Sequence, residues 1–311
     1  MNGYENAEAL AEEAVEEKSI GIERPAAKTA AALSLIIASA MFASGYPLAR
    51  AINPAAGVDM MILQGMLAGS IILTLLGKKE SKLEKGHGWP MLFNGVGSTV
   101  TAFLIMEGAK VISPALAAVI VISNSIMVAG FSWLMKRKSF TIVQAAALLA
   151  GFAGVVWISL ERGVLAGEIL GVLYLLLAAV LIALMTMAIE NPVKESGGSA
   201  ITRWSFWVSF AVTAILVAVT GRLHFFSLEQ TGLAIFFGVV ATGAPSLLFN
   251  EGMGKVGAAD AAAYKLLIPV FAFVYGIALM GEIPNLSAIA ASLLVIFSLG
   301  VYQVSNQADS R

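Results

Sequence analysis

The chain has 311 residues, of which 59% are hydrophobic and only 13% are charged, and its net charge is -1. A soluble domain carries about 25% charged residues, so this composition, with a mean hydropathy of +0.86, excludes an ordinary soluble protein. The chain has no cysteine, which excludes disulfides, a thiolate nucleophile and a cysteine metal site.

The first segment, residues 1–27, is acidic and polar, with seven glutamates between Glu5 and Glu23. A secretory signal would have a basic start followed by an apolar core. This segment has neither, so we expect an exposed, disordered tail on the cytoplasmic side.

From Ala30 to Gln303 the chain consists of apolar stretches of roughly twenty residues separated by short polar breaks. An α-helix of that length crosses a bilayer of about 30 Å and satisfies its own backbone hydrogen bonds. The sequence therefore predicts an all-α integral membrane protein with ten transmembrane helices. We place them at 30–50, 59–77, 90–109, 114–135, 141–159, 168–190, 201–220, 230–252, 259–280 and 286–304.

Two loop features refine this prediction. Ser227 and Gln230 have the spacing of a capping box, and Asp260 stands where a carboxylate can cap a helix start. Lysine and arginine are about threefold more frequent in the loops that lie on the side of the N-terminus. This bias places both termini in the cytoplasm and the protein in the cell (inner) membrane.

The two halves of the chain resemble each other. Lys110-Val111 matches Lys255-Val256 at the same offset that aligns Ala117-Ala118 with Ala262-Ala263. Five spans per half is an odd number, so the second copy is expected to insert upside down, as in many secondary transporters. We therefore expect two inverted repeats around a central cavity. Their bounds are 28–162 and 163–305, followed by a short cytoplasmic tail at 306–311.

These signatures resemble the drug/metabolite transporter superfamily, EamA type. The resemblance rests on the stretch from Lys255 to Val270, on Gly281-Glu282, and on the first-half stretch 113–160. It implies a ten-helix permease for small metabolites, often amino acids or related compounds that are exported. Asn124 stands where the family usually has proline and Gln64 where it usually has arginine, so no substrate carries over from better-known members.

Lys265 is the main candidate for substrate binding. It lies about two turns inside the ninth predicted span, next to Tyr264. A charge inside a span costs at least about 2.5–3.5 kcal/mol and usually faces a cavity or a partner. There Lys265 could receive a carboxylate or phosphate. In the alternative interpretation, its long stem lifts the ammonium to the membrane interface.

Three prolines lie inside predicted spans: Pro47, Pro245 and Pro269. Each frees a backbone carbonyl that lipid cannot satisfy, so they are candidates for helix breaks and gating. A kink that only improves packing is the alternative. Polar residues nearby favour a polar pathway, and we count as cavity candidates Tyr46, Ser246 and Asn250.

Asn124 and Ser123 form a polar patch in the fourth predicted span, and Asn124 matches Pro269 in the repeat. They could bind substrate or join helices by hydrogen bonds. Other polar and small residues are expected to serve helix packing: Ser98, Thr99, Thr101, Gly65, Gly69, Gly151 and Gly154.

Glu107 and Glu251 close their spans near Lys110 and Lys255, at a spacing that supports interfacial ion pairs. Proton coupling through either glutamate is the alternative, which requires a carboxylate deeper in the membrane.

No motif of an enzyme is present. His87 and His224 lie in different loops without ligands at metal spacing, and the sequence contains no phosphate-cradling loop or nucleophile elbow. We expect no metal, cofactor, nucleic acid or obligatory protein partner, but a small-molecule substrate and membrane lipid.

The sequence thus favours a secondary transporter of anionic or zwitterionic metabolites that works by alternating access. Its substrate would contact the first, third, fourth, sixth, eighth and ninth spans. One alternative is efflux of drugs or lipophilic cations, which would require an accessible carboxylate. Another is a membrane receptor or scaffold that transports nothing.

Overall fold

The computed structural model describes residues 25–45, 58–76, 84, 86–111, 114–160, 169–221, 227–280 and 286–309. These residues are almost entirely helical, and no strand occurs among them. Tyr46, Pro47 and most of the acidic tail lie outside the described residues. The elements in chain order are α2 (Pro25–Ala43), α4 (Val58–Leu76), α5 (Gly88–Val111), α6 (Pro114–Ile122), α7 (Asn124–Leu134), α8 (Ile142–Leu160), α9 (Ile169–Ser196), α10 (Gly198–Thr220), α11 (Leu228–Phe236), the π-helix η2 (Phe237–Gly243), α12 (Ala244–Val256), α13 (Ala258–Tyr264), the 3-10 helix η3 (Lys265–Leu267), α14 (Ile268–Met280) and α15 (Leu286–Asp309).

The predicted all-α membrane architecture is confirmed at the level of helices. In the described part of the chain, seven helical stretches are long and apolar enough to cross a membrane. Shorter apolar helices occur at Lys28–Ala43, Ile120–Leu134 and Ile142–Gly154. Large apolar side chains such as Ile142 and Phe297 are exposed on the outer surface, where lipid would cover them.

Several predicted boundaries are wrong by a few residues. The helix α9 continues to Ser196, and its last turns are supported by a salt bridge of 3.1 Å between Glu190 and Lys194. The helix α15 continues to Asp309, so the expected tail at 306–311 begins as its last turn. Hydropathy marks where the apolar stretch stops, but a helix can extend into water beyond it.

Helix caps follow the sequence in one of two cases. The capping box of Ser227 and Gln230 is confirmed at the start of α11. Asp260 lies in the first turn of α13, where a carboxylate faces the positive end of the helix dipole as expected. It does not cap the helix, because the N-cap is Gly257 and Asp260 accepts hydrogen bonds from the side chains of Lys138 and Tyr302.

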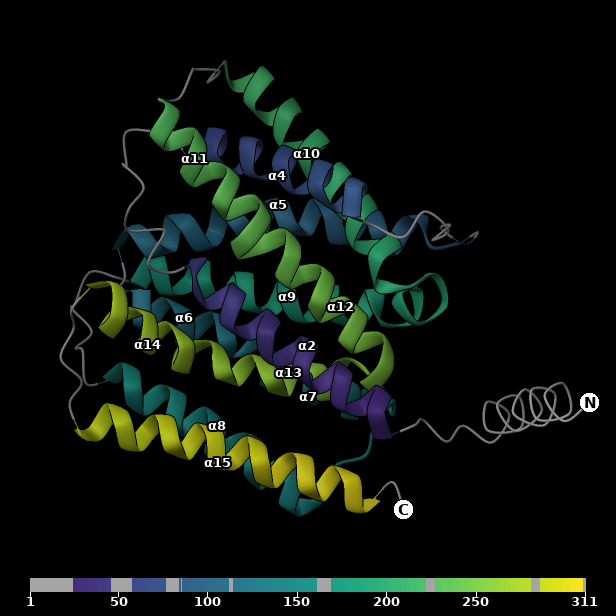
Figure 1. The fold of residues 1–311 in the computed structure, drawn as a ribbon, viewed down its shortest axis with the longest axis vertical. Coiled ribbons are helices and arrows are strands. Elements are labelled where there is room, and N and C mark those ends of the chain that lie inside the picture. The colour runs from purple at the N-terminus through teal and green to yellow at the C-terminus, as the bar shows by residue number, and fades with distance from the viewer. Residues whose placement is uncertain are drawn as a thin grey trace, which may run out of the picture.

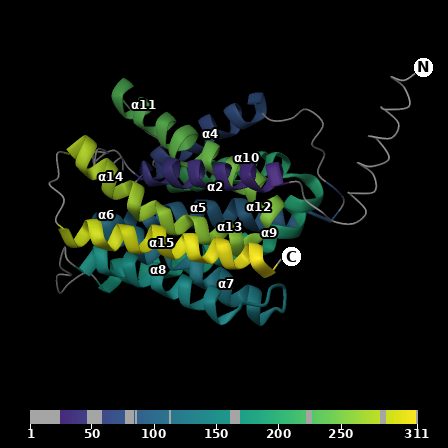
Figure 2. The same cartoon turned by 60° about the horizontal axis from the view of Figure 1, so that its bottom comes forward.

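The helices lie roughly parallel or antiparallel in a bundle (Figure 1). Helices α8 and α15 pair along one edge, and α4, α10 and α11 form the opposite edge in both views (Figures 1 and 2). Between the edges, α5 packs along α9 and α2 packs along α12. The start of α2 and the ends of α7, α9, α12 and α15 lie at the same end of the bundle. We call it the basic end, because it carries Lys28, Lys136, Lys194 and Lys255.

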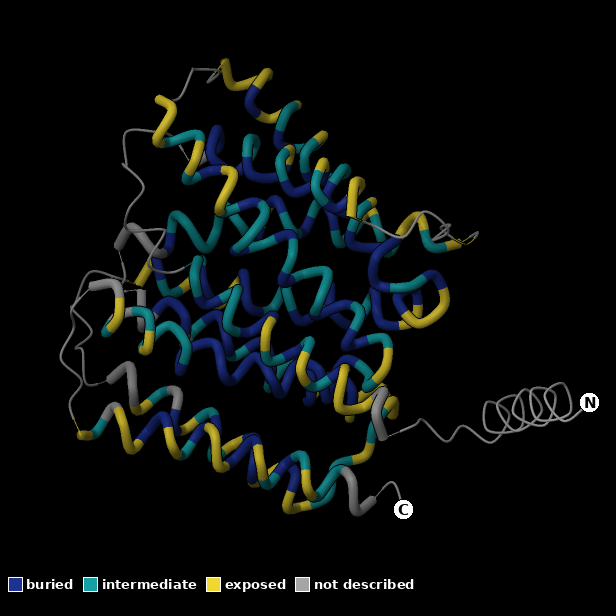
Figure 3. The backbone as a smooth tube through the Cα atoms, viewed as in Figure 1, coloured by how far each residue is buried: buried dark blue, intermediate teal, exposed yellow. Residues whose placement is uncertain are grey.

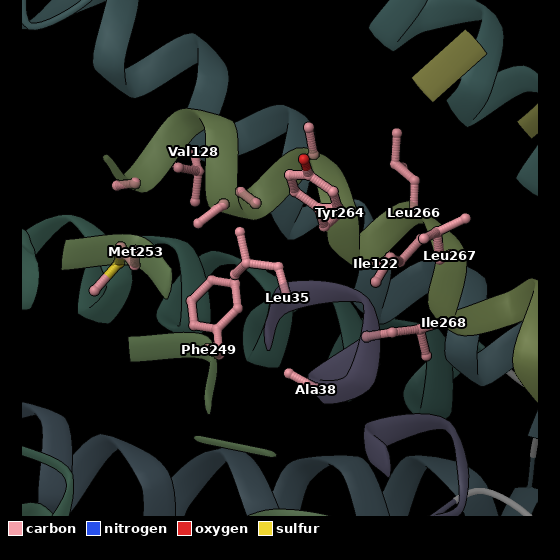
Figure 4. Packing of buried hydrophobic residues seen from close by; sticks show 14 of the residues in the cluster. Leu35, Ala38, Ile122, Val128, Phe249, Met253, Tyr264, Leu266, Leu267 and Ile268 are labelled. Carbon is pink, nitrogen blue, oxygen red and sulfur yellow. The ribbon is translucent and has the colours of Figure 1, made fainter. Parts of the chain in front are cut away.

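The hydrophobic core lies in the middle of the bundle, where buried positions are concentrated (Figure 3). Leu35 and Ala38 of α2 pack in one cluster with Phe249 of α12 and Tyr264 of α13 (Figure 4). The core therefore joins segments that lie far apart in the sequence.

Glycines allow close helix approach at both edges, as predicted. A Cβ on Gly69 of α4 would lie 2.8 Å from the carbonyl oxygen of Gly238 in η2. A Cβ on Gly154 of α8 would lie 3.0 Å from Val295 of α15. Thr99 joins α5 to α10 through a 2.7 Å hydrogen bond with Ser209, which confirms its role in helix packing.

Candidate functional site

A cavity of about 260 Å³ lies inside the bundle. Its walls come from α2, α4, α5, the α6–α7 pair, α9, α10, η2, α12, η3 and α14. Three of these walls contain an interruption of α-helical geometry: between α6 and α7 at Ser123, at η2, and at η3. Two of these helices, α4 and α10, were not expected to contact substrate, and they contribute Met66, Thr202 and Phe206.

Two of the interruptions lie next to prolines, as the sequence indicated. Pro269 has no N–H to donate to the carbonyl of Lys265, and the N–H of Ile268 donates to that carbonyl in the 3-10 pattern. Pro245 is the second residue of α12 and lies two residues after the end of the π-helix. The gating role of these residues stays a prediction.

The structure places Lys265 in the wall of the cavity. Its side chain is buried, with a relative exposure of 8%, and its Nζ lies 4.0 Å from the ring centroid of Phe249. The described residues provide neither a hydrogen bond nor a salt bridge for this ammonium, and none of those that line the cavity is acidic. The site thus presents a desolvated cation whose contact is an aromatic face.

Asn124 contributes an unsatisfied acceptor to the same cavity. Its Nδ2 donates to the carbonyl of Val121 at 2.5 Å, whereas its buried Oδ1 has no hydrogen-bond partner among the described residues. Ser123 donates to the carbonyl of Ile120 at 2.6 Å and is not among the residues that line the cavity. Both side chains therefore satisfy carbonyls freed by the helix break and do not join neighbouring helices.

A second polar group in the wall comes from α10 and α12. Asn250 donates to the hydroxyl of Thr202 at 2.8 Å, and Thr202 donates to the carbonyl of Gly198 at 2.7 Å. Ser246 lines the cavity one turn before Asn250. Sequence reasoning missed Thr202, because a hydroxyl in the first turn of a span is common and does not show which face it occupies.

Other predicted residues lie elsewhere. Tyr264 belongs to the hydrophobic core and does not line the cavity, although it directly precedes Lys265. Glu251 accepts the N–H of Ser199 at 2.9 Å, so the expected ion pair with the exposed Lys255 is wrong. The side chain of Lys110 lies outside the described residues. Glu107 is partly buried and lies near the C-terminal end of α5.

Two residues of α5 were assigned to the wrong role. Ser98 and Thr101 line the cavity and donate hydrogen bonds within their own helix, to the carbonyls of Asn94 and Ser98. They were expected at helix–helix contacts. A hydroxyl in a span can either join neighbouring helices or line a cavity, so the residue type does not distinguish the two roles.

Comparison with known proteins agrees with the family resemblance seen in the sequence. The model of the EamA-like transporter family matches residues 29–160 and 169–302. YvbV, an uncharacterized transporter of Bacillus subtilis (strain 168), is 25% identical over 293 residues, covering 91% of this chain and 94% of YvbV. An uncharacterized transporter of Clostridium kluyveri is 23% identical over 261 residues, covering 80% of this chain and 83% of its own.

The fold also resembles a solved crystal structure, with a TM-score of 0.70 over 91% of this chain and 99% of the other. The two sequences are 16% identical, so the likeness concerns the fold alone.

Proposed function

The chain belongs to the EamA-like transporter family, and from this premise we propose that it is a secondary transporter that works by alternating access. It moves small metabolites with a negatively charged group, such as amino acids or related anionic or zwitterionic compounds, in the direction of export. The multi-pass chain lies in the inner membrane, with the basic end and both termini in the cytoplasm.

The proposal includes a membrane topology of ten spans in two inverted repeats. The spans are α2, α4, α5, α6–α7 and α8 in the first repeat, and α9, α10, α11–α12, α13–α14 and α15 in the second. The family model matches the chain in two segments that nearly coincide with the repeats 28–162 and 163–305, which supports this division.

Helix packing supports the same symmetry. Exchange of the two repeats maps the pairs α4–α10 and α8–α15 onto themselves, and it maps the pair α5–α9 onto α12–α2. These four pairs have the most extensive contacts in the bundle. A cavity between two such repeats is where secondary transporters bind substrate.

The observation that carries the proposed substrate class is the ammonium of Lys265 in the cavity wall, for which the described residues provide no anionic partner. An anionic group would satisfy this charge, whereas a lipophilic cation would be repelled by it. The volume of about 260 Å³ equals about nine water molecules of about 30 Å³ each. This is close to the lower end of the range of about 300–1,000 Å³ for small-molecule sites, so the cavity is large enough for a small metabolite.

Uptake and counterflow in proteoliposomes test this function. Pooled anionic and zwitterionic metabolites would be offered to the wild type, Lys265→Ala, Lys265→Met and the matched control Lys255→Met. We expect transport by the wild type and by Lys255→Met, and at least a tenfold loss in both Lys265 variants, because an interaction with charge is worth about 1.5–3 kcal/mol. Unchanged transport in both variants would disprove the role of Lys265.

Two further outcomes concern the mechanism. Absence of counterflow for every compound would favour the receptor or scaffold alternative. Collapse of the pH gradient, with Glu107→Gln and Glu251→Gln in parallel, tests proton coupling, which predicts that accumulation is lost without the gradient and in one of these variants.

A further inference from the structure

The turn between α7 and α8 has a backbone conformation that is costly for its sequence. Lys136 has a φ of 55°, in the left-handed region that usually takes glycine. The N–H of Lys136 donates to the carbonyl of Trp133 at 3.0 Å, and the N–H of Arg137 to that of Ser132 at 2.9 Å. This hydrogen-bond pattern ends a helix abruptly, and it is followed by two basic residues that each reach a buried carboxylate.

The first carboxylate is Glu190 of α9, whose relative exposure is 8%. Arg137 donates to its Oε2 at 3.1 Å and also to the carbonyl of Met187 at 3.0 Å. The Oε1 of Glu190 accepts Nζ of Lys194 at 3.1 Å and the N–H of Ala258 at 3.1 Å. Glu190 therefore holds the start of α13 as well as the α7–α8 turn.

The second carboxylate is Asp260 of α13, whose relative exposure is 9%. Its Oδ1 accepts Nζ of Lys138 and the hydroxyl of Tyr302, the latter at 2.7 Å. The same Nζ donates to Oδ1 of Asn306 at 3.0 Å and lies 5.6 Å from the ring centroid of Phe140. This cluster joins the α7–α8 turn to α13 and α15.

Both clusters lie directly beside the cavity on the side of the basic end. Ile189 lines the cavity and is followed by Glu190. Lys265 lines it too, and Asp260 precedes Lys265 by five residues, or about 7.5 Å along a helix. A passage from the cavity to the basic end between α7, α9 and α13 would therefore have to separate these charges.

The two carboxylates have no acidic counterpart at the equivalent positions of the first repeat. The offset that aligns Lys110 with Lys255 places Gly45 at the position equivalent to Glu190 and Ala115 at the position equivalent to Asp260. Neither can form an ion pair. If the two repeats exchange conformations during transport, the contacts of Glu190 and Asp260 stabilise closure at the basic end, and their equivalent positions cannot repeat these contacts.

We infer that Glu190 and Asp260 form an ionic lock at the basic end, and that the cavity opens to this end only when Arg137 and Lys138 release these carboxylates. The inference rests on the alternating access of the proposed function. It assigns the closed side and the residues that close it. A ligand or voltage that opens this side has to supply the free energy by which both clusters stabilise the closed state. A ligand does so only through the difference between its affinities for the two states.

Cysteine accessibility tests the lock without any known substrate. The chain has no native cysteine, so Thr186→Cys places one thiol in the cavity wall. A membrane-impermeant maleimide would be added from the basic end, the side from which a cysteine at position 255 is labelled. In Glu190→Gln and Asp260→Asn we expect labelling of Cys at position 186 to accelerate about tenfold, because the closed state loses a charged contact. The matched control is Glu195→Gln, an exposed carboxylate at the same end that contacts His87 at 2.9 Å, and it should leave the rate unchanged.

Two variants keep the test decisive. Loss of one partner of a buried ion pair can unfold a protein, whereas Tyr302→Phe removes a single donor from Asp260 and should accelerate labelling severalfold in a folded protein. The exchange of Lys138→Asp with Asp260→Lys should restore slow labelling. The lock would be overturned if the labelling rate were unchanged in folded Glu190→Gln, Asp260→Asn and Tyr302→Phe. It would also be overturned if the double variant were labelled as fast as Asp260→Asn.

The outcomes separate this inference from the proposed function. Faster labelling in a protein that transports no metabolite would support the lock and contradict the substrate proposal. Robust transport, together with a labelling rate that none of the variants changes, would support the substrate proposal and contradict the lock.

Discussion

The Nζ of Lys265 lies against the face of Phe249, at 4.0 Å from the ring centroid, and the described residues place no carboxylate within salt-bridge distance of it. A desolvated cation–π contact contributes about 2 kcal/mol. This offsets only part of the cost of a lysine inside a span, about 2.5–3.5 kcal/mol on insertion scales and more in simulations. An anionic group in the cavity would supply the rest, so substrate and lysine should stabilise each other.

This reciprocity predicts a difference in thermal unfolding between the wild type and Lys265→Met. A transported anion at about one hundred times its Kd should stabilise the wild type by about 2.7 kcal/mol, and it should not stabilise the variant. Without ligand, the variant should be at least as stable as the wild type, because the buried charge is gone and the apolar stem is kept. Differential scanning fluorimetry in detergent measures both effects, with Lys255→Met as the control. Equal stabilisation by the ligand in all three proteins would contradict the contact.

Asn124 allows a second prediction, because its Oδ1 accepts no hydrogen bond from the part of the chain that the structure describes, and its Nδ2 donates to the nearby carbonyl of Val121. Asn124→Leu should change the free energy of unfolding by no more than about 1 kcal/mol, the typical net contribution of one hydrogen bond. Substrate affinity should fall about tenfold, since a donor on the substrate would be left without its acceptor. Isothermal titration measures the affinity. Ser123→Ala, which alters the same helix break outside the cavity wall, should bind normally, and the idea fails if it loses as much affinity as Asn124→Leu.

The predictable part of the site consists of its polar residues in apolar surroundings. Lys265, Asn124 and Asn250 stand out in the sequence, because lipid penalises such groups unless a cavity or partner receives them. Thr202 and Phe249 could not be found in this way, since hydroxyl and aromatic residues occur on every face of a span. Only packing shows that Tyr264 belongs to the core and its neighbour Lys265 to the cavity.

At the scale of elements, apolar length predicted where helices lie but not how they are interrupted. The bounds of α4 and α8 agree with the sequence to within one residue. The interruption at η3 follows from Pro269, whereas the break between α6 and α7 occurs at Ser123 without any proline. No residue pattern announces the π-helix η2, although Pro245 marks its end. Such irregular segments depend on neighbours that satisfy the freed backbone groups, and these are not visible in one sequence.

The interruption at η3 can be removed by Pro269→Ala. The restored N–H can donate to the carbonyl of Lys265, which would favour one continuous helix from α13 to α14. A proline inside a helix costs about 3 kcal/mol, so the variant should be more stable, while the redirected Lys265 should lower the transport rate about tenfold or more. Thermal unfolding and initial uptake rates measure the two effects. If the variant transports at the wild-type rate, the break has no part in the transport cycle. Pro114→Ala serves as the control, because Pro114 occupies the first position of α6, where proline replaces no hydrogen bond.

For the whole molecule, symmetry of packing and asymmetry of charge have different consequences. The pairs α5–α9 and α12–α2 exchange under the proposed repeat symmetry, so two conformations of opposite openness can use the same contacts. The ion pairs of Glu190 and Asp260 occur at the basic end and their equivalent positions are Gly45 and Ala115, so the two conformations differ in electrostatic energy. Comparison of the two halves of the sequence revealed the packing symmetry. The partners of Glu190 and Asp260 were not predictable, because they come from the α7–α8 turn and from α15, which lie far from both carboxylates in the sequence.

The inverted arrangement makes a prediction about Lys110 and Lys255, which occupy equivalent positions in the two repeats. With five spans per repeat, the turn after the third span and the turn after the eighth must lie on opposite faces of the membrane. Single cysteines at these positions, in a chain that has no other cysteine, should therefore react with an impermeant maleimide from opposite sides of oriented vesicles. A cysteine at position 28, at the start of α2, should react from the same side as that at 255, because α2 begins at the basic end. Labelling of positions 110 and 255 from one face would exclude an odd number of spans between the repeats and, with it, the exchange of conformations on which alternating access depends.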